Sequence, residues 1–165
     1  ITSVLRKIDV PTVLFFLGFL SAVAALQSAG QLNVLAKFLD ENMGNVYLID
    51  LSIGLLSAIV DNVPLVAGAM KMYPVANDTM CLAAANPEYM TNFVQNGIFW
   101  SFLAYTAGTG GSILIIGSAA GVAAMGLEKI DFIWYMKRIS LLALLGYLAG
   151  AGAYYLQVQL FGTLL

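Results

Sequence analysis

The strongest constraint in this sequence is a pair of polar residues near the centre of a long apolar run. Residues 46–73 are predominantly apolar, yet Asp61-Asn62-Val63-Pro64 stands near their middle. A charged residue at the centre of a bilayer costs at least ~2.5–3.5 kcal/mol on insertion scales, so a chain keeps one only where protein, water or an ion satisfies it. The run is therefore either one kinked spanning helix or a re-entrant hairpin with Asp61-Asn62 at its tip. Each arm of such a hairpin would have about 11 residues, roughly half the thickness of the hydrocarbon core.

The composition indicates an integral membrane protein. Hydrophobic residues make up 61% of the 165 residues and charged residues 10%, against roughly 25% charged in a soluble domain. With no histidine in the sequence, proton chemistry near neutral pH falls to a carboxylate. The single Cys81 cannot form an internal disulfide, and there is neither a Cys/His metal pattern nor a basic patch for nucleic acid. No nucleophile–base pair lies in the apolar segments, so we expect a protein that is not an enzyme and has no bound cofactor.

Glycines, prolines and charges divide the chain into segments. The apolar positions of residues 31–43 share one helical face, which predicts an amphipathic helix at the membrane interface, with an extramembrane connector as the alternative. Because the sequence begins at Ile1 rather than Met, we also expect a fragment of a longer protein. The expected segments are a span at 12–29, the interfacial helix at 31–43, the interrupted run at 46–73, a polar loop at 74–95, a broken span at 96–125 and a last span at 139–161.

A second interruption lies within residues 96–125, at Gly108-Thr109-Gly110-Gly111-Ser112. Three glycines in four residues cost too much for an undisturbed helix interior. The pattern predicts two half-helices with an unwound middle, and a packing role for the glycines is the alternative.

The distribution of Lys and Arg tests these topologies. If residues 46–73 form a hairpin and residues 96–125 cross the bilayer, five cations share one side: Arg6, Lys7, Lys129, Lys137 and Arg138. Lys37 and Lys71 then lie opposite, which is the bias expected of a cytoplasmic side. If both interrupted segments are hairpins, the bias is the same with the orientation reversed, and if both cross, no bias remains. The count favours one hairpin or two without choosing between them.

Both interruptions carry side-chain oxygens. A broken helix in lipid exposes backbone groups that only protein, water or a bound ion can satisfy. The oxygens belong to Ser57, Asp61 and Asn62 in the first interruption and to Thr106, Thr109 and Ser112 in the second. Carbonyl, hydroxyl and carboxylate oxygens suit a hard cation such as sodium, whereas N–H groups at a helix start suit an anion. The residues alone predict an ion site without fixing the sign of its charge.

Asp61 adds a mechanism to this site. A carboxylate that holds either a proton or a sodium ion, but not both, exchanges one for the other across a membrane. The alternative is that Asp61 only caps the second arm. Asp50 lies about one turn into the first arm, and we expect it to reach water and to have no role. Four further acids are expected to be solvated: Asp40, Glu41, Glu128 and Asp131.

Two stretches of the sequence resemble a known family. SAIVDNVPLVAGAM and LAYTAGTGGSILIIGSAAGVAAMGLEKIDFIWYMKRIS are similar to the C-terminal half of NhaD-type sodium/proton antiporters, relatives of arsenite permeases and of citrate and dicarboxylate transporters. The likeness runs from about residue 9 to residue 160. It implies two inverted repeats, each with a re-entrant hairpin (here DNVP at the tip) and a discontinuous helix (here GTGGS). By position it implies ion-site roles for Ser57, Asp61, Asn62, Thr109 and Ser112, with Thr106 beside them.

The resemblance implies an all-α integral membrane protein that is one repeat of an inverted-repeat transporter. We expect it to exchange sodium (or lithium) for protons as the C-terminal half of the carrier, with sodium held at Asp61 and Asn62. Its expected partners are the lipid bilayer and a missing N-terminal repeat, and homo-oligomerisation stays open. The expected location is the bacterial inner membrane, crossed several times, with Lys129, Lys137 and Arg138 on the cytoplasmic side.

Two other functions stay open at this point. An anion, dicarboxylate or arsenite carrier of the same superfamily is one, although no Lys or Arg stands near either interruption in the sequence. A non-transporting structural subunit of a membrane complex is the other.

Overall fold

The computed structural model describes residues 10–162, and these fold into helices joined by turns and loops. The helices are α2 (Val10–Ser28), α3 (Gln31–Met43), α4 (Val46–Leu56), α5 (Asn62–Met72), α6 (Asp78–Ala83), α7 (Pro87–Met90), η1 (Thr91–Phe93), α8 (Ile98–Gly110), α9 (Ala119–Leu127), α10 (Phe132–Arg138) and α11 (Ser140–Phe161). Within residues 10–162 the extended pairing is limited to an isolated bridge between Ala76 and Val94. The all-α prediction is confirmed for this part of the chain. Arg6 and Lys7, which entered the charge count, lie outside the described residues.

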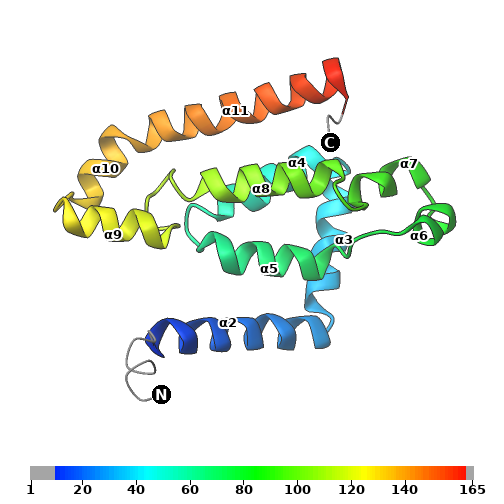
Figure 1. Ribbon diagram of the computed structural model, residues 1–165, viewed down its shortest axis with the longest axis horizontal. Coiled ribbons are helices and arrows are strands. Elements are labelled where there is room, and N and C mark those ends of the chain that lie inside the picture. The colour runs from blue at the N-terminus through cyan, green and yellow to red at the C-terminus, as the bar shows by residue number, and fades with distance from the viewer. Residues whose placement is uncertain (1–9, 163–165) are drawn as a thin grey trace, which may run out of the picture.

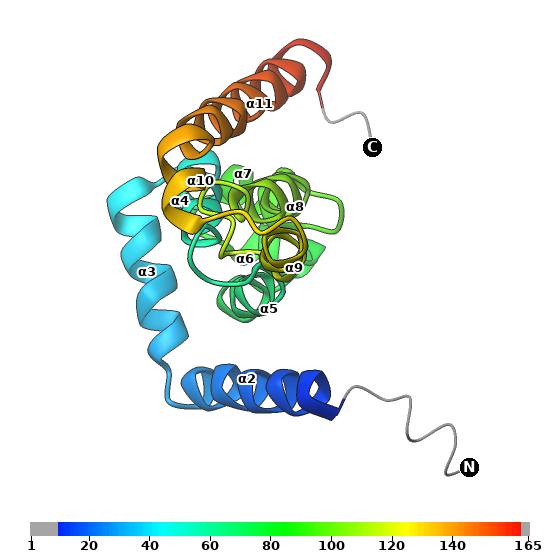
Figure 2. The ribbon, with the colours of Figure 1, turned by 90° about the vertical axis from the view of Figure 1, so that its left-hand side faces the viewer.

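Three helices form the centre of the molecule, and two longer ones flank them. α4, α5 and α8 lie along the long axis, with α2 and α11 on opposite sides of this group (Figure 1, Figure 2). α3 crosses one end at a steep angle and joins α2 to α4 (Figure 1). The contact between α4 and α8 forms the main core, whose members are almost wholly buried: Ile49, Ile53, Phe99, Phe102 and Leu103.

α3 is an amphipathic helix bounded by two glycines. Gly30 and Gly44 have φ angles of 73° and 57°, a left-handed conformation that glycine adopts without strain. The helix buries Leu32 and Ala36 on one face. Its place at a membrane interface stays a prediction.

Asp40 is held by the fold, and the prediction that it would be solvated is wrong. Its Oδ1 accepts hydrogen bonds from the hydroxyls of Tyr73 and Tyr89, at 3.3 and 3.0 Å. Burial, and then the hydrogen bond to Asp40, raise the pKa of Tyr89, so its hydroxyl keeps the proton that it donates. These bonds dock the loop after α5 onto α3, a contact between residues far apart in sequence.

The first interruption makes the chain turn back. α4 ends at Leu56 and α5 begins at Asn62, with non-helical turns between them. The start of α4 and the end of α5 lie at the same end of the molecule, beside α3 (Figure 1). Pro64 stands in the first turn of α5, where its missing N–H removes no helical hydrogen bond. This path does not fit the interpretation of residues 46–73 as one kinked spanning helix.

The second interruption separates α8 from α9. α8 ends at Gly110 and α9 begins at Ala119, and residues 111–118 form a series of turns. Ile115 adopts a left-handed conformation there, with a φ of 59°.

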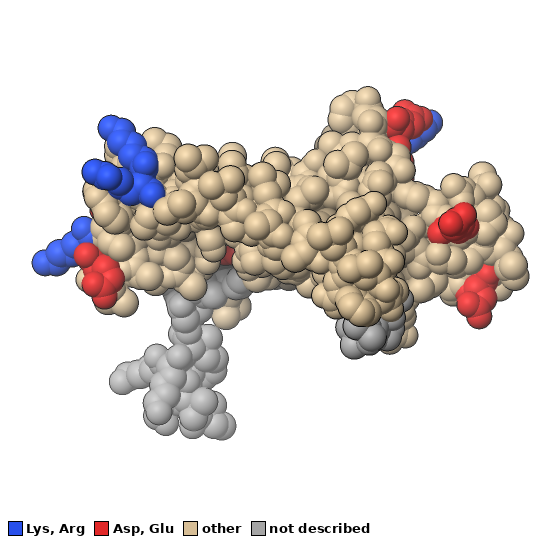
Figure 3. Space-filling view, turned by 90° about the horizontal axis from the view of Figure 1, so that it is seen from above, with Lys and Arg blue, Asp and Glu red and all other residues tan. Residues whose placement is uncertain are grey.

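The charges lie at the two ends of the molecule. Among the described helices, α11 is long and apolar enough to cross a membrane, by length and composition. Lys and Arg gather at the end formed by α9 and α10, and acids predominate at the opposite end, while the surface between shows only a small acidic patch (Figure 3). This distribution fits a molecule whose long axis crosses a bilayer.

Candidate ion-binding site

α4 and α8 run parallel, and this brings the two interruptions together. Near the start of α4, Tyr47 packs against Phe102 of α8 with ring centroids 5.4 Å apart. At the end of α4, the Ser57 Oγ donates to the carbonyl of Ala107 at 2.7 Å. Both interruptions therefore begin at about the same level of the molecule (Figure 1).

Glycines allow the backbones to touch at this level. A Cβ on Gly54 would lie 2.6 Å from the Cβ of Thr106. A Cβ on Gly110 would overlap the carbonyl oxygen of Gly54, and one on Gly117 would overlap the carbonyl oxygen of Ser57. Gly110 thus has a packing role, which was the alternative to ion binding for the glycines of the second interruption, whereas a Cβ on Gly108 would meet nothing within 4 Å. The close contact also places Gly117 directly against the first interruption.

Three of the six predicted site residues supply hydroxyls on α8 and at the end of α4, and two of them, Ser57 and Thr106, lie at the α4–α8 contact itself. Ser57 and Thr106 are wholly buried, and Thr109 is half-buried. The Oγ1 of Thr106 donates to the Leu103 carbonyl at 3.3 Å, and the Oγ1 of Thr109 donates to the Tyr105 carbonyl at 2.7 Å. Each hydroxyl, like that of Ser57, gives its one proton to a backbone carbonyl, so what it has left to offer is oxygen lone pairs.

Asp61 and Asn62 are half-buried at the start of α5. Asp61 caps this helix, because its Oδ1 accepts a hydrogen bond from the Val63 N–H at 3.4 Å. Asn62 lines an open pocket of about 270 Å³ between α5 and α8, together with Val63, Val66, Ala104, Ala107 and Gly108. Ala107 also receives the hydrogen bond from Ser57, so Asn62 and Ser57 approach the same stretch of α8.

The structure does not bring the Ser112 side chain into this cluster. Ser112 is exposed, and it is its backbone carbonyl that is held, by the hydroxyl of Tyr135 at 2.7 Å. α10 thereby fixes the second interruption from the opposite side.

Asp50 is the residue that sequence reasoning missed. It was expected to reach water, but its side chain is wholly buried, and neither carboxylate oxygen has a hydrogen-bond partner within residues 10–162. That expectation is wrong because α4 packs its Asp50 face against α8. The spacing of Val46, Asp50, Ile53 and Ser57 was the available signal, since these positions share one side of a helix.

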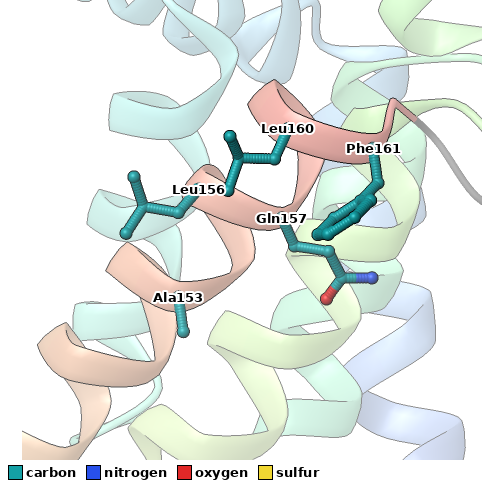
Figure 4. Close-up of a pocket in the computed structure, with 5 residues that line it drawn as sticks. All are labelled: Ala153, Leu156, Gln157, Leu160 and Phe161. Atoms are coloured by element: carbon teal, nitrogen blue, oxygen red, sulfur yellow. The ribbon is translucent and has the colours of Figure 1, made fainter.

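Other features of the described structure do not form a second site. A shallow pocket near the end of α11 is lined by Ala153, Leu156, Gln157, Leu160 and Phe161, with Gln157 its only polar side chain (Figure 4). It lies at the opposite end of α11 from the second interruption (Figure 1). No group of three His, Cys, Asp or Glu side chains in the described part of the chain could hold a metal ion. A sodium ion here would depend on one carboxylate together with amide, hydroxyl and carbonyl oxygens.

Comparison with known proteins establishes the family. A model of the citrate transporter family (CitMHS) matches residues 1–94, more than half of the chain. The chain belongs to the citrate transporter family. No solved structure matches this family member.

This citrate transporter family member is also similar to proteins named as antiporters. It is 48% identical over 154 residues to "Sodium/proton antiporter 1" and 44% identical over 150 residues to "Sodium/proton antiporter 2", both of Arabidopsis thaliana. It is 33% identical over 138 residues to "Na(+)/H(+) antiporter NhaD" of Vibrio cholerae. These alignments cover 93%, 91% and 82% of this chain but 24%, 32% and 24% of those proteins. They confirm the resemblance to NhaD-type proteins, which are transporters and not enzymes, and the chain spans about a quarter to a third of their length.

Proposed function

We propose that this chain belongs to the C-terminal half of a carrier that exchanges sodium (or lithium) for protons across a membrane. The observation that carries the proposal is that the two helix interruptions meet beside the buried hydroxyls of Ser57 and Thr106, with the half-buried Asp61 four residues after Ser57 in the first interruption. The antiporter names of the relatives support the ion and the exchange.

The groups at the interruptions favour a cation over an anion. Ser57, Thr106 and Thr109 have each given their hydroxyl proton to a carbonyl, so only their lone pairs remain for a ligand. The negative end of the α4 dipole also points at this level. Every Lys and Arg of the described residues is exposed. Lys71, on α5 itself, stands roughly 14 Å along the helix from Asn62 at 1.5 Å per residue.

Asp61 is the residue that exchanges the two ions. Its carboxylate binds either a proton, forming one O–H bond, or a sodium ion shared with Asn62 and neighbouring oxygens. Either partner neutralises the carboxylate, and the two exclude each other. The capping bond to Val63 uses one lone pair of Oδ1, so further acceptor positions of the carboxylate stay open for an ion.

The topology that we propose follows from the same site. α4 and α5 form a re-entrant hairpin, α8 and α9 form a discontinuous helix, and a second, inverted repeat completes the site. The end that carries Lys129, Lys137 and Arg138 faces the cytoplasm, as a positive-inside bias requires. The bacterial inner membrane and homo-oligomerisation stay predictions.

The test compares two N-capping acids. Asp131 caps α10 as Asp61 caps α5, with its Oδ1 2.9 Å from the Trp134 N, but Asp131 is exposed and lies on α10, outside the contact between α4 and α8. Asparagine caps a helix as well as aspartate does. In the complete protein we expect Asp61→Asn to abolish sodium-dependent proton movement in inverted vesicles and Asp131→Asn to leave it intact. If Asp61→Asn keeps exchange with unchanged sodium affinity, Asp61 is a cap and the proposal fails.

A second candidate function is transport of citrate or a similar carboxylate. The description of the matching family favours it, and so do the N–H groups at the start of α5 beside the open pocket. Uptake of labelled citrate into the same vesicles decides between the two functions. Citrate uptake that persists when sodium/proton exchange is undetectable would select this second candidate.

A further inference from the structure

Asp50 lies in the contact between α4 and α8, one helical turn before Gly54, and no partner explains it. Its exposed fraction is 0%, and within the described residues both carboxylate oxygens lack a hydrogen bond. The described helices alone bury the side chain completely. A further segment of the protein could reach the carboxyl only by displacing one of the packed helices.

The surroundings of Asp50 supply no positive charge. The described Lys and Arg side chains are all exposed, and the buried residues of α8 at this level are Phe99, Phe102 and Leu103. The titratable groups on the elements packed around Asp50 are mostly tyrosines: Tyr105 of α8, Tyr147 and Tyr154 of α11, Tyr73 after α5 and Tyr89 of α7. The last two are hydrogen-bonded to Asp40 of α3, which is the remaining titratable group in this region.

Four of these five tyrosines donate their protons to other acceptors. Tyr147 donates to the Leu51 carbonyl at 2.9 Å, and Tyr105 donates to the Tyr147 carbonyl at 2.9 Å. Tyr73 and Tyr89 donate to Asp40. The Tyr154 hydroxyl accepts a hydrogen bond from Ser101, and it does not bond to either carboxylate oxygen of Asp50. None of these five hydroxyls donates a hydrogen bond to the Asp50 carboxyl.

A buried carboxylate with neither a cation nor a hydrogen-bond donor avoids its charge by taking up a proton. We propose that Asp50 is a second proton-binding site of the carrier, separate from the ion site at Asp61, which holds a proton while α4 is packed on α8 and releases it to water when this contact opens. Binding forms one O–H bond on the Asp50 carboxyl. The site stands 11 residues before Asp61 on the same pair of helices, and the inference does not depend on which ion Asp61 exchanges.

The direct test is infrared difference spectroscopy of the complete purified carrier during a pH change. We expect the wild type to show a carbonyl band of a buried protonated carboxyl that shifts in D₂O. Asp50→Asn should remove this band, whereas Asp61→Asn and the exposed-acid control Asp131→Asn should retain it. A wild type without the band, or a band that survives Asp50→Asn, would overturn the proposal. If Asp50→Asn does not fold, Asp50→Glu provides the measurement, because it should move the band without deleting it.

A second readout uses stability. Because the packed form holds the proton, raising the pH should lower the melting temperature of the wild type, and Asp50→Asn should show a smaller pH dependence than Asp131→Asn. Equal pH dependence in the wild type and in Asp50→Asn would also reject the site. Both readouts concern Asp50 alone. They can fail while Asp61→Asn still abolishes exchange, and they can succeed while Asp61→Asn leaves exchange intact, so the two proposals are tested separately.

Discussion

Substituting two glycines of the same helix separates helix propensity from contact. Gly108 and Gly110 both lie in α8. A Cβ added to Gly108 meets nothing within 4 Å. A Cβ added to Gly110 would overlap the Gly54 carbonyl oxygen and lie 2.8 Å from its carbon and 3.3 Å from the Ser57 Cβ. The obstacle is the backbone of α4, which cannot move aside as a flexible side chain can.

The magnitudes of the two effects oppose each other. Alanine is favoured over glycine in a helix by up to ~1 kcal/mol, and overpacking a close contact costs typically ~1–3 kcal/mol. We expect Gly108→Ala to be neutral or to stabilise by up to about 1 kcal/mol. We expect Gly110→Ala to destabilise by about 1–2 kcal/mol, since the propensity gain offsets part of the overlap.

Thermal unfolding of the two variants of the complete carrier, purified in parallel, measures the difference. The melting temperature should fall for Gly110→Ala and stay level or rise for Gly108→Ala. If Gly110→Ala proves as stable as Gly108→Ala, then α4 and α8 do not touch at this level and the meeting of the two interruptions is refuted.

Two further results are expected. Ser57→Ala should weaken the sodium affinity of exchange more than Ser52→Ala does. Ser57 lies at the first interruption, whereas Ser52 contacts the Met43 sulfur away from it. Equal sodium affinities of the two variants would show that Ser57 is not part of the site. The loop after α5 should leave α3 at alkaline pH. The pKa of Tyr89 is higher in the folded than in the unfolded protein. The Tyr89 hydroxyl therefore stabilises the fold fully at pH values below its unfolded pKa of about 10, and this stabilisation is lost as the pH rises above that value. Protease cleavage of residues 74–97 should rise there, and less steeply in Tyr89→Phe.

Local sequence signals predicted where the helices are interrupted. Pro64 and the glycines between Gly108 and Gly111 act on the backbone of their own segment, so their effect needs no knowledge of neighbouring helices. Both helices do end near these signals, at Leu56 and at Gly110. However, Gly108 and Thr109 are still helical, and the unwound residues are 111–118 rather than 108–112. The apolar spacing of residues 31–43 likewise indicates the buried face of α3, on which Leu32 and Ala36 lie.

The environment of the acids could not be predicted in this way. Asp40 accepts hydrogen bonds from tyrosines that are 33 and 49 residues away in the sequence. A local sequence pattern cannot predict contacts between residues so far apart. Asp50 was placed by its distance from the start of its helix, whereas its burial depends on which face α8 covers. Ser112 is exposed despite its place in a glycine-rich interruption, and this too depends on how the turns after Gly110 pack, which the local sequence does not show.

Asp50 and Asp61, the two acids of the α4–α5 pair, differ in whether a neighbouring helix covers them, and this difference matters for a carrier. Asp61 is half-exposed and stands at an interruption of the helix, so an ion can reach it without separating packed helices. Asp50 stands in an unbroken helix contact, so its proton can leave only when that contact changes. α4 is an uninterrupted helix of 11 residues, and Ser57, at its end, touches both Ala107 and Gly117. A displacement at the interruptions that moves Ser57 as part of this rigid helix would therefore move Asp50 as well, which is the physical link that the proposed second proton site requires.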